Sequence, residues 1–281
     1  MGSHPFVICD VFTDRPLQGN QLAVFTHASA IDDGLLHALA REMHFSETVF
    51  VYPGDAAADF RIRIFTPNVE LPFAGHPVLG TGFVLAAGTT AGAIRLRCDA
   101  GVIPIRLDRE GEALRFGWMT QVTPRIEPMP QPDALLRALG VQKAALPVDV
   151  YDNGVRHAFV GLETEAEVAR LQPDLAALAR LLPSTGISCF AGAARRWKTR
   201  MFGPGLGVPE DPATGSAAGP LAVHLARYER IAFDSEIEIS QGVEISRPST
   251  LFARVSGTPD RIERVEVGGS AVIVARGEFS L

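Results

Sequence analysis

Apolar residues recur along this 281-residue chain with two periods, one typical of strands and one typical of helices. Short apolar runs in the first half predict strands at Phe6–Thr13, Gln21–Phe25, Thr48–Tyr52, Asp59–Phe65, Ala93–Arg97 and Gly101–Asp108. Between the second and third of these, apolar residues at helical spacing follow Asp32, a favourable N-cap, and predict a helix over Asp32–Met43. The first half therefore reads as mostly strands with few helices.

A proline-rich stretch, Thr123–Pro132, interrupts the pattern as a linker would. Beyond it we predict helices near Asp133–Gly140, Glu163–Leu171 and Leu175–Leu182, and strands at Val148–Tyr151, His157–Gly161, Ser188–Ala193 and Thr199–Phe202. The C-terminal third returns to strand-like sequence. We accordingly expect two half-domains, residues 1–122 and 123–281, with the last strand packing back on the first half.

The two halves carry a common pattern, which predicts an internal repeat. The segment RIFTPNVELP from Arg63 aligns with RMFGPGLGVP from Arg200 at an offset of 137 residues, with Arg, Phe and two Pro in common. At the same offset, Gly82 meets Gly219. Both segments lead into an unusual stretch of small and apolar residues. An offset close to half the chain length favours a duplicated half-domain.

Each small-residue stretch predicts a helix that is enclosed on all sides. The first, from Pro77, is apolar all round yet contains Gly80 and Gly82, and the second spans Thr214–Ala226 with two further glycines, Gly215 and Gly219. A helix without a polar face is buried, and glycine allows other backbone to approach closely. We expect strands of the same half to wrap each helix as a partial barrel, with Pro77 at the first helical position.

Composition and charge exclude several classes of function. The net charge is −6, and positive and negative residues are mixed along the chain. The chain has no basic stripe, so we do not expect a nucleic-acid partner. The one dense basic run, Arg195–Arg200, is expected to be a solvated strand edge. No apolar run reaches the roughly 18 residues that a bilayer span needs, so no membrane association is expected. Residues 1–4 are left out of the fold prediction because they resemble the remnant of an expression tag more than a targeting segment.

The cysteines and histidines give no sign of a metal site. Cys9, Cys98 and Cys189 are odd in number and widely spaced, which is typical of reduced cytosolic thiols rather than of a disulfide framework. The seven histidines show no metal-ligand spacing. We expect a cytoplasmic protein without a bound metal.

Three ionisable residues stand where chemistry could occur. Glu47 lies where the predicted helix has ended and a strand begins, and His76 and Asp211 precede the two buried helices. Taken singly, each is more often solvated or structural. If all three converge, Glu47 could carry a proton, because an enclosed surrounding favours its protonated form. The helix starts near Gly75 and Gly215 would offer N–H groups and a partial positive charge to a carboxylate or phosphate.

At these residues the chain resembles the PhzF phenazine-biosynthesis family. The resemblance rests on FTDRPLQGN from Phe12, SET from Ser46, PFAGHP from Pro72 and EDPATGS from Glu210, and extends from Phe6 to the C-terminus. It implies an α+β, diaminopimelate-epimerase-like fold with two similar halves. Further segments, including NG at Asn153, RH at Arg156 and QGVEI at Gln241, resemble the phenazine enzymes within the family. Gln21 and the loop 203–208 differ from the sequence pattern of the phenazine enzymes. The identity of the substrate therefore stays open.

The resemblance also implies a reaction and a set of roles. The substrate would be a cyclohexadiene carrying a carboxylate, an amine and a hydroxyl, and Glu47 would move a proton between two of its carbons. His76 and Asp211 would position the hydroxyl and amine. Ser46, Gly75, Gly215 and Ser216 would bind the substrate. No metal or organic cofactor is implied, and a homodimer is expected.

Three other functions are alternatives to this interpretation of the sequence. A two-cysteine racemase on the same fold requires a thiol at the start of each buried helix, but these positions hold Ala74–His76 and Asp211–Ala213. An isomerase of the family acting on another small cyclic or amino acid remains open, as does a non-catalytic binding module.

Overall fold

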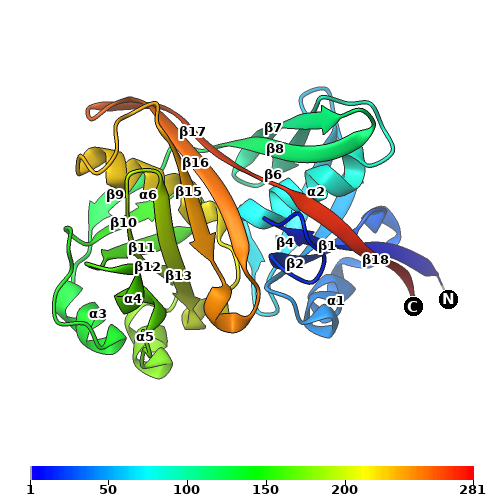
Figure 1. Ribbon diagram of the computed structural model, residues 1–281. Coiled ribbons are helices and arrows are strands. Elements are labelled where there is room, and N and C mark those ends of the chain that lie inside the picture. Colours follow the sequence, from blue (N-terminus) through cyan, green and yellow to red (C-terminus); the bar gives the residue numbers. More distant parts are fainter. Residues whose placement is uncertain (1) are drawn as a thin grey trace. The chain divides into compact units, whose positions relative to one another are not determined.

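The computed structural model describes residues 2–281 and divides into two compact units. Unit 1 comprises Met1–Thr120 and Gly268–Leu281, and unit 2 comprises Gln121–Val267. The last strand therefore belongs to the unit that contains the first one, and Figure 1 shows the red C-terminal strand beside the blue N-terminal strand.

Unit 1 is built mainly from strands. Its elements are β1 (Ser3–Val11), β2 (Asn20–Phe25), α1 (Leu36–Met43), β3 (Glu47–Pro53), β4 (Phe60–Phe65), β5 (Glu70–Leu71), α2 (Gly75–Ala86), β6 (Ala93–Cys98), β7 (Gly101–Glu110), β8 (Ala113–Gln121) and β18 (Ala271–Ser280). Helix α2 packs against β1, β2, β3, β6, β7 and β18. The predicted apolar helix is thus enclosed by strands of its own unit.

Unit 2 repeats this plan and adds helices. Its elements are β9 (Arg125–Pro128), α3 (Pro132–Leu139), β10 (Asp149–Asp152), β11 (Arg156–Gly161), α4 (Glu165–Ala169), α5 (Leu175–Leu181), β12 (Thr185–Ala193), β13 (Arg196–Gly203), β14 (Val208–Asp211), α6 (Gly215–Arg227), β15 (Glu236–Gln241), β16 (Ser249–Thr258) and β17 (Arg261–Gly269). Helix α6 packs against β11 and β16, whereas α3, α4 and α5 share a separate core with β10–β13.

Strand pairing confirms the internal repeat. In unit 1 the pairs β1–β2, β3–β4 and β6–β7 are antiparallel, and β2–β3 and β4–β6 are parallel. In unit 2 the pairs β10–β11, β12–β13 and β15–β16 are antiparallel, and β11–β12 and β13–β15 are parallel. The same sequence of connections in both units indicates one architecture used twice.

The predicted alignment of the two halves holds at β4 and β13 but fails after them. Arg63 pairs with Glu70 through two hydrogen bonds, and Arg200 pairs with Glu210 in the same way. Glu70 and Glu210 stand 140 positions apart, as do the helix starts at residues 75 and 215. The constant offset of 137 is therefore wrong from β14 onward, because Glu210 lies ten positions after Arg200 whereas Glu70 lies seven positions after Arg63. Gly82 does not correspond to Gly219.

The predicted need for small residues is confirmed at Gly80 and Gly219. A Cβ on Gly80 would lie 2.6 Å from Val11 Cγ2, and one on Gly219 would lie 2.6 Å from Val265 Cγ1. Real Cβ atoms do not approach other carbons so closely, so any larger residue would push the strands away from the helices. Glycine costs about 1 kcal/mol relative to alanine in a helix interior, and close packing offsets that cost here.

Several local predictions are corrected by the structure. Helix α2 begins at Gly75, so Pro77 is its third residue rather than its first; a missing N–H is still harmless there, because the first four N–H groups have no intrahelical acceptor. The predicted linker contains strand β9, which pairs with β10. Residues 33–35 form a 3-10 turn, capped by Asp32 as predicted, before α1 begins.

Two further corrections concern the chain ends and the basic run. Ser3 and His4 belong to β1, where they pair with Ser280 and Phe279, so the opening residues are part of the fold. Arg195–Arg200 is not a strand edge, because β13 lies between β12 and β15. None of the helices that residues 2–281 form is both long and apolar enough to span a membrane.

Candidate active site

Glu47 and His76 meet in unit 1. Glu47 is the first residue of β3 and His76 the second residue of α2. Glu47 Oε2 lies 3.5 Å from His76 Nε2, and the side chains are 14% and 3% exposed. Ser46 immediately precedes Glu47. A partly exposed carboxylate beside a buried imidazole is an arrangement that can transfer a proton to or from a small molecule.

The FTDRPLQGN segment positions the side chain that orients His76. The segment forms a tight loop in which Phe12, Leu17 and Gly19 have left-handed backbone conformations, and Asp10 accepts a hydrogen bond from the N–H of Leu17. The loop delivers Asn20 to the start of β2, where its Nδ2 lies 3.1 Å from His76 Nδ1. If the amide donates to Nδ1, the neutral ring carries its proton on Nε2, the nitrogen nearest Glu47.

Asp211 is held within a buried polar network in unit 2. It ends β14 and is 4% exposed. Its Oδ2 accepts a hydrogen bond of 2.6 Å from the hydroxyl of Thr214. Gln241 donates to the carbonyl of Asp211 at 2.8 Å and contacts Thr214 Oγ1 at 2.9 Å. Thr199 in turn donates to the other end of the Gln241 amide. The network fixes both the backbone and the carboxylate of Asp211.

Gly215 and Ser216 open helix α6, and side chains from other elements contact both of them. Ser216 Oγ lies 2.9 Å from His157 Nε2. The carbonyl of Ser216 accepts from Asn153 at 3.0 Å, and that of Gly215 accepts from Gln121 at 2.8 Å. The start of α6 is thereby rigid, and its first N–H groups have no intrahelical acceptors. Such a helix start suits an anion.

The predicted site residues thus form two groups. Unit 1 brings together Glu47 and His76, with Ser46 and Gly75 as their chain neighbours, and unit 2 brings together Asp211, Gly215 and Ser216. That all of them act on one substrate stays a prediction. Sequence reasoning assigned no role to the residues that hold these groups: Asn20, Gln121, Asn153, His157, Thr214 and Gln241. All of them except Gln121 lie in segments that carry the family resemblance. A further signal was present, since Pro220 inside an apolar helix requires a substitute donor for a carbonyl one turn earlier.

The cysteines are unsuited to act as acid or base. Cys9, Cys98 and Cys189 are buried and unbridged. Burial raises the pKa of Cys189 to about 12, and it also raises the pKa of Cys9 and Cys98. The thiols therefore stay protonated near neutral pH. Among residues 2–281, no group of three or more His, Cys, Asp and Glu side chains is arranged to hold a metal ion.

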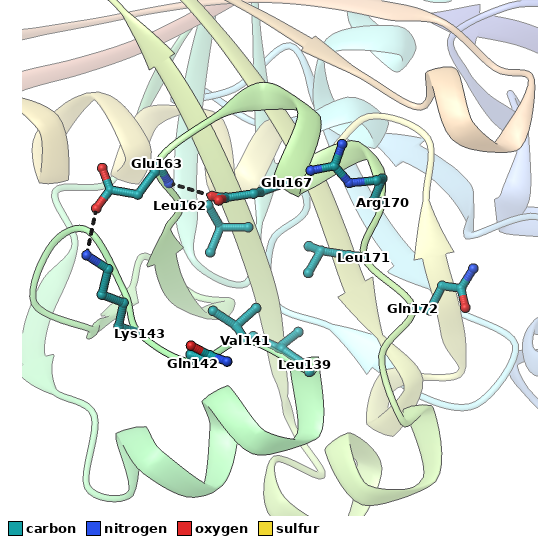
Figure 2. Close-up of a pocket in the computed structure, with 11 residues that line it drawn as sticks. Leu139, Val141, Gln142, Lys143, Leu162, Glu163, Glu167, Arg170, Leu171 and Gln172 are labelled. Carbon is teal, nitrogen blue, oxygen red and sulfur yellow. Dashed lines mark hydrogen bonds and ion pairs between the residues drawn. The ribbon is translucent and has the colours of Figure 1, made fainter.

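A surface cavity of about 480 Å³ lies in unit 2 away from these groups (Figure 2). Leu139, Val141, Leu162 and Leu171 form its apolar part, and Lys143 pairs with Glu163 at its rim. None of the predicted site residues lines it. Glu167 caps α4 here, so its carboxylate is already used. The cavity is therefore not part of the candidate active site.

Comparison with known proteins identifies the family to which the chain is similar. The chain matches the PhzC-PhzF family, described as phenazine biosynthesis-like protein, over residues 9–277. It is 46% identical to a protein of Pseudomonas aeruginosa named trans-2,3-dihydro-3-hydroxyanthranilate isomerase, over 99% of this chain and 100% of that one. A protein with the same name from Pseudomonas chlororaphis is also 46% identical, with the same coverage.

Solved structures extend the comparison to the fold. A PhzF-family protein from Bacillus anthracis superposes with a TM-score of 0.85 at 24% identity, covering 100% of both chains. A hydroxyproline epimerase from Agrobacterium vitis superposes with a TM-score of 0.68 at 13% identity, covering 99% of this chain and 91% of that one. The predicted diaminopimelate-epimerase-like α+β fold is confirmed. The chain belongs to the PhzC-PhzF family of phenazine biosynthesis-like proteins.

Proposed function

We propose that this chain is an isomerase that converts trans-2,3-dihydro-3-hydroxyanthranilate into 6-amino-5-oxocyclohex-2-ene-1-carboxylate, as a step of phenazine-type biosynthesis. Support comes from the Pseudomonas isomerases that match it along the full length. The observation that carries the proposal is the Glu47–His76 pair at the start of the buried helix α2. It supplies a carboxylate that can exchange a proton with a bound carbon acid.

Glu47 removes the proton from C3 of the substrate, the carbon that bears the hydroxyl. The electron pair of that C–H bond forms a C3–C4 double bond, the C4–C5 pair moves to C5–C6, and the C6–C1 pair accepts a proton at C1. Glu47 returns the proton there, on the same face of the ring. The resulting enol becomes the ketone by shifting its hydroxyl proton to C4. No atom is gained or lost, so the reaction requires no oxidant, reductant or organic cofactor.

The developing negative charge extends toward the substrate carboxylate. N–H groups at the starts of α2 and α6 and the hydroxyl of Ser216 bind that carboxylate, and His76 and Asp211 hold the hydroxyl and amine. A well-placed donor at a developing anion is worth about 3–4 kcal/mol of transition-state stabilisation. Glu47 of unit 1 moves the proton, and the remaining groups, which come from both units, bind and orient the substrate.

The thiol-based alternative is disfavoured on physical grounds. A two-base racemase of the epimerase fold needs thiols that ionise at the helix starts. Here the cysteines lie in β1, β6 and β12, and burial raises the pKa of all three. The same positions at the helix starts hold a histidine and a serine, His76 and Ser216.

The test uses the purified, chelator-treated protein and the dihydro-hydroxyanthranilate in heavy water. We expect the substrate's diene absorbance to fall and one deuterium to enter the product at C1 through exchange on Glu47. The Glu47→Gln variant, which is isosteric, should bind the substrate but leave its absorbance unchanged. The proposal is wrong if the wild-type protein leaves this compound intact but isomerises another small cyclic compound or amino acid.

A further inference from the structure

His157 holds the hydroxyl of Ser216 from a neighbouring strand. It is the second residue of β11 and is 1% exposed. Its Nε2 lies 2.9 Å from Ser216 Oγ. The ring packs against β12, where His157 pairs with Gly186, and a Cβ on Gly186 would lie 2.6 Å from its Nδ1. The bare glycine therefore creates the space in which the imidazole sits.

The surroundings of the ring determine which nitrogen carries the proton. Burial lowers the pKa of His157 to about 4, so the imidazole is neutral near pH 7 and only one nitrogen is protonated. Nδ1 has no hydrogen-bond partner. A buried N–H without an acceptor is among the rarest features of folded proteins, which assigns the proton to Nε2. Nε2 then donates to Ser216 Oγ, and the hydroxyl hydrogen of Ser216 is left to point at a different acceptor.

The backbone of Ser216 is held by a second side chain. Residue 220 is a proline, so the carbonyl of Ser216 lacks the N–H that would normally bond to it within the helix. Asn153 Nδ2 takes its place at 3.0 Å. The same amide lies 3.3 Å from Gln121 Oε1, and Gln121 donates to the carbonyl of Gly215. Both ends of Ser216, its carbonyl and its hydroxyl, are thereby fixed.

Unit 1 contains the equivalent contact. Strand β2 occupies in unit 1 the place that β11 has in unit 2, since each pairs antiparallel with the strand before it and parallel with the next. Asn20 at the start of β2 contacts His76, and His157 at the start of β11 contacts Ser216. His76 and Ser216 are each the second residue of a buried helix. The repeat has kept this arrangement while changing the residues.

We propose that His157 is a positioning residue that, by donating to Ser216 Oγ, forces the serine hydroxyl to donate its own hydrogen to the carboxylate of the substrate. This inference rests on the proposed function for the identity of the substrate. The acceptor class, a carboxylate, follows from the donor character that both the hydroxyl and the helix start then present.

The kinetic test compares His157→Gln, His157→Phe, Ser216→Ala and the double variant His157→Phe/Ser216→Ala. We expect His157→Phe and Ser216→Ala each to lower kcat/KM about 10- to 100-fold, mostly through KM, and the double variant to be no worse than Ser216→Ala. His157→Gln keeps an amide at the position of Nε2 and should stay within about 5-fold of the wild type. Independent, multiplying losses in the double variant would contradict the proposal.

The chain offers a matched control in His224. Like His157 it is buried, and burial lowers its pKa to about 3. It lies in α6, contacts Tyr151 at 3.1 Å and is two turns beyond Ser216. His224→Phe should lower the melting temperature about as much as His157→Phe and leave kcat/KM within about 2-fold. Equal kinetic losses in these two phenylalanine variants would mean that His157 acts only on stability.

A spectroscopic readout separates this proposal from the proposed function. In protein labelled with ¹⁵N at histidine, the resonances of His157 should show a neutral ring with its proton on Nε2, and they should shift in Ser216→Ala. Affinity for a stable aromatic analogue with the same three substituents, measured by calorimetry, should fall about 10- to 100-fold in Ser216→Ala. A ring protonated on Nδ1 would overturn the proposal even in an active enzyme. An inactive wild-type protein with the expected spectrum and affinities would overturn only the proposed function.

Discussion

The starts of the two buried helices share one plan but present different chemistry. Each follows a strand pair joined by a two-pronged Arg–Glu ion pair, Arg63–Glu70 before α2 and Arg200–Glu210 before α6. At the second helical residue, unit 1 has His76 within 3.5 Å of a carboxylate, whereas unit 2 has Ser216 beside a neutral imidazole. Under the proposed function, proton transfer belongs to unit 1, and unit 2 contributes only to binding and orienting the substrate.

The difference also teaches how a duplicated half-domain can specialise. The strand connections and the ion pairs are the same in both units, because they determine where the helix begins. The residues at the two helix starts nevertheless differ, with His76 in unit 1 and Ser216 in unit 2, and both are buried. The four predictions below test this division, from the largest expected effect to the smallest.

Replacing Glu47 should separate the two roles most clearly. Glu47→Gln should lower kcat about 10³- to 10⁴-fold with little change in KM, because general acid–base catalysis contributes about that much. Asp211→Asn, which changes the predicted site carboxylate of unit 2, should lower kcat/KM about 10- to 100-fold and act mainly on KM. Steady-state kinetics of both variants would measure this. Equal kcat losses in the two variants would remove the division of labour.

The two Arg–Glu pairs should differ in their contribution to stability. Arg200 is 8% exposed and also donates to the carbonyls of Val168, Ala169 and Leu171 at the end of α4. Arg63 instead makes its additional contact to the exposed Asp33. Arg200→Ala should lower the free energy of unfolding by about 3 kcal/mol, since it leaves the partly buried Glu210 carboxylate and the three carbonyls without this donor, and Arg63→Ala by about 1 kcal/mol. Urea unfolding measures both, and similar values would show that the pairs are interchangeable.

Acid should destabilise the protein through the histidines of unit 2. Burial lowers the pKa of His157 to about 4 and of His224 to about 3, so below the unfolded-state pKa of about 6.5 the unfolded chain binds more protons than the folded one. The free energy of unfolding should therefore fall as the pH drops from 6.5 toward 4, by at most about 1.4 kcal/mol per pH unit for each histidine.

The variant His224→Gln isolates one of these contributions. Its unfolding free energy, measured in urea between pH 4.5 and 7.5, should have a smaller slope below pH 6.5 and the wild-type slope above it. An unchanged slope below pH 6.5 would show that His224 is not the acid-sensitive group.

The smallest effect concerns Pro220, which lies in the interior of α6. Asn153→Ala should cost about 2 kcal/mol in the free energy of unfolding, because it leaves the Ser216 carbonyl without a donor. In a Pro220→Ala background the helix supplies its own N–H, and the same change should cost about 1 kcal/mol. Urea unfolding of the four proteins of this cycle measures the coupling. Strictly additive costs would mean that Asn153 does not substitute for the missing N–H.

Local sequence determined the elements and much of the chemistry. Periodicity predicted most strands and the enclosed helices, because burial of an apolar face depends on residues close in the chain. The motifs around Glu47, His76 and Asp211 carried the family resemblance. The repeat was visible as well, although the longer stretch between Arg200 and Glu210 displaced its alignment by three residues.

Only the tertiary structure decided what holds the site. The contacts of Asn20 with His76, of His157 with Ser216 and of Gln241 with Asp211 join residues that are at least 30 positions apart. Strand register brings these pairs together, and register depends on pairing between distant strands rather than on local pattern. For the same reason, the sequence could show that Pro220 leaves a carbonyl without a donor, but only the fold could supply Asn153.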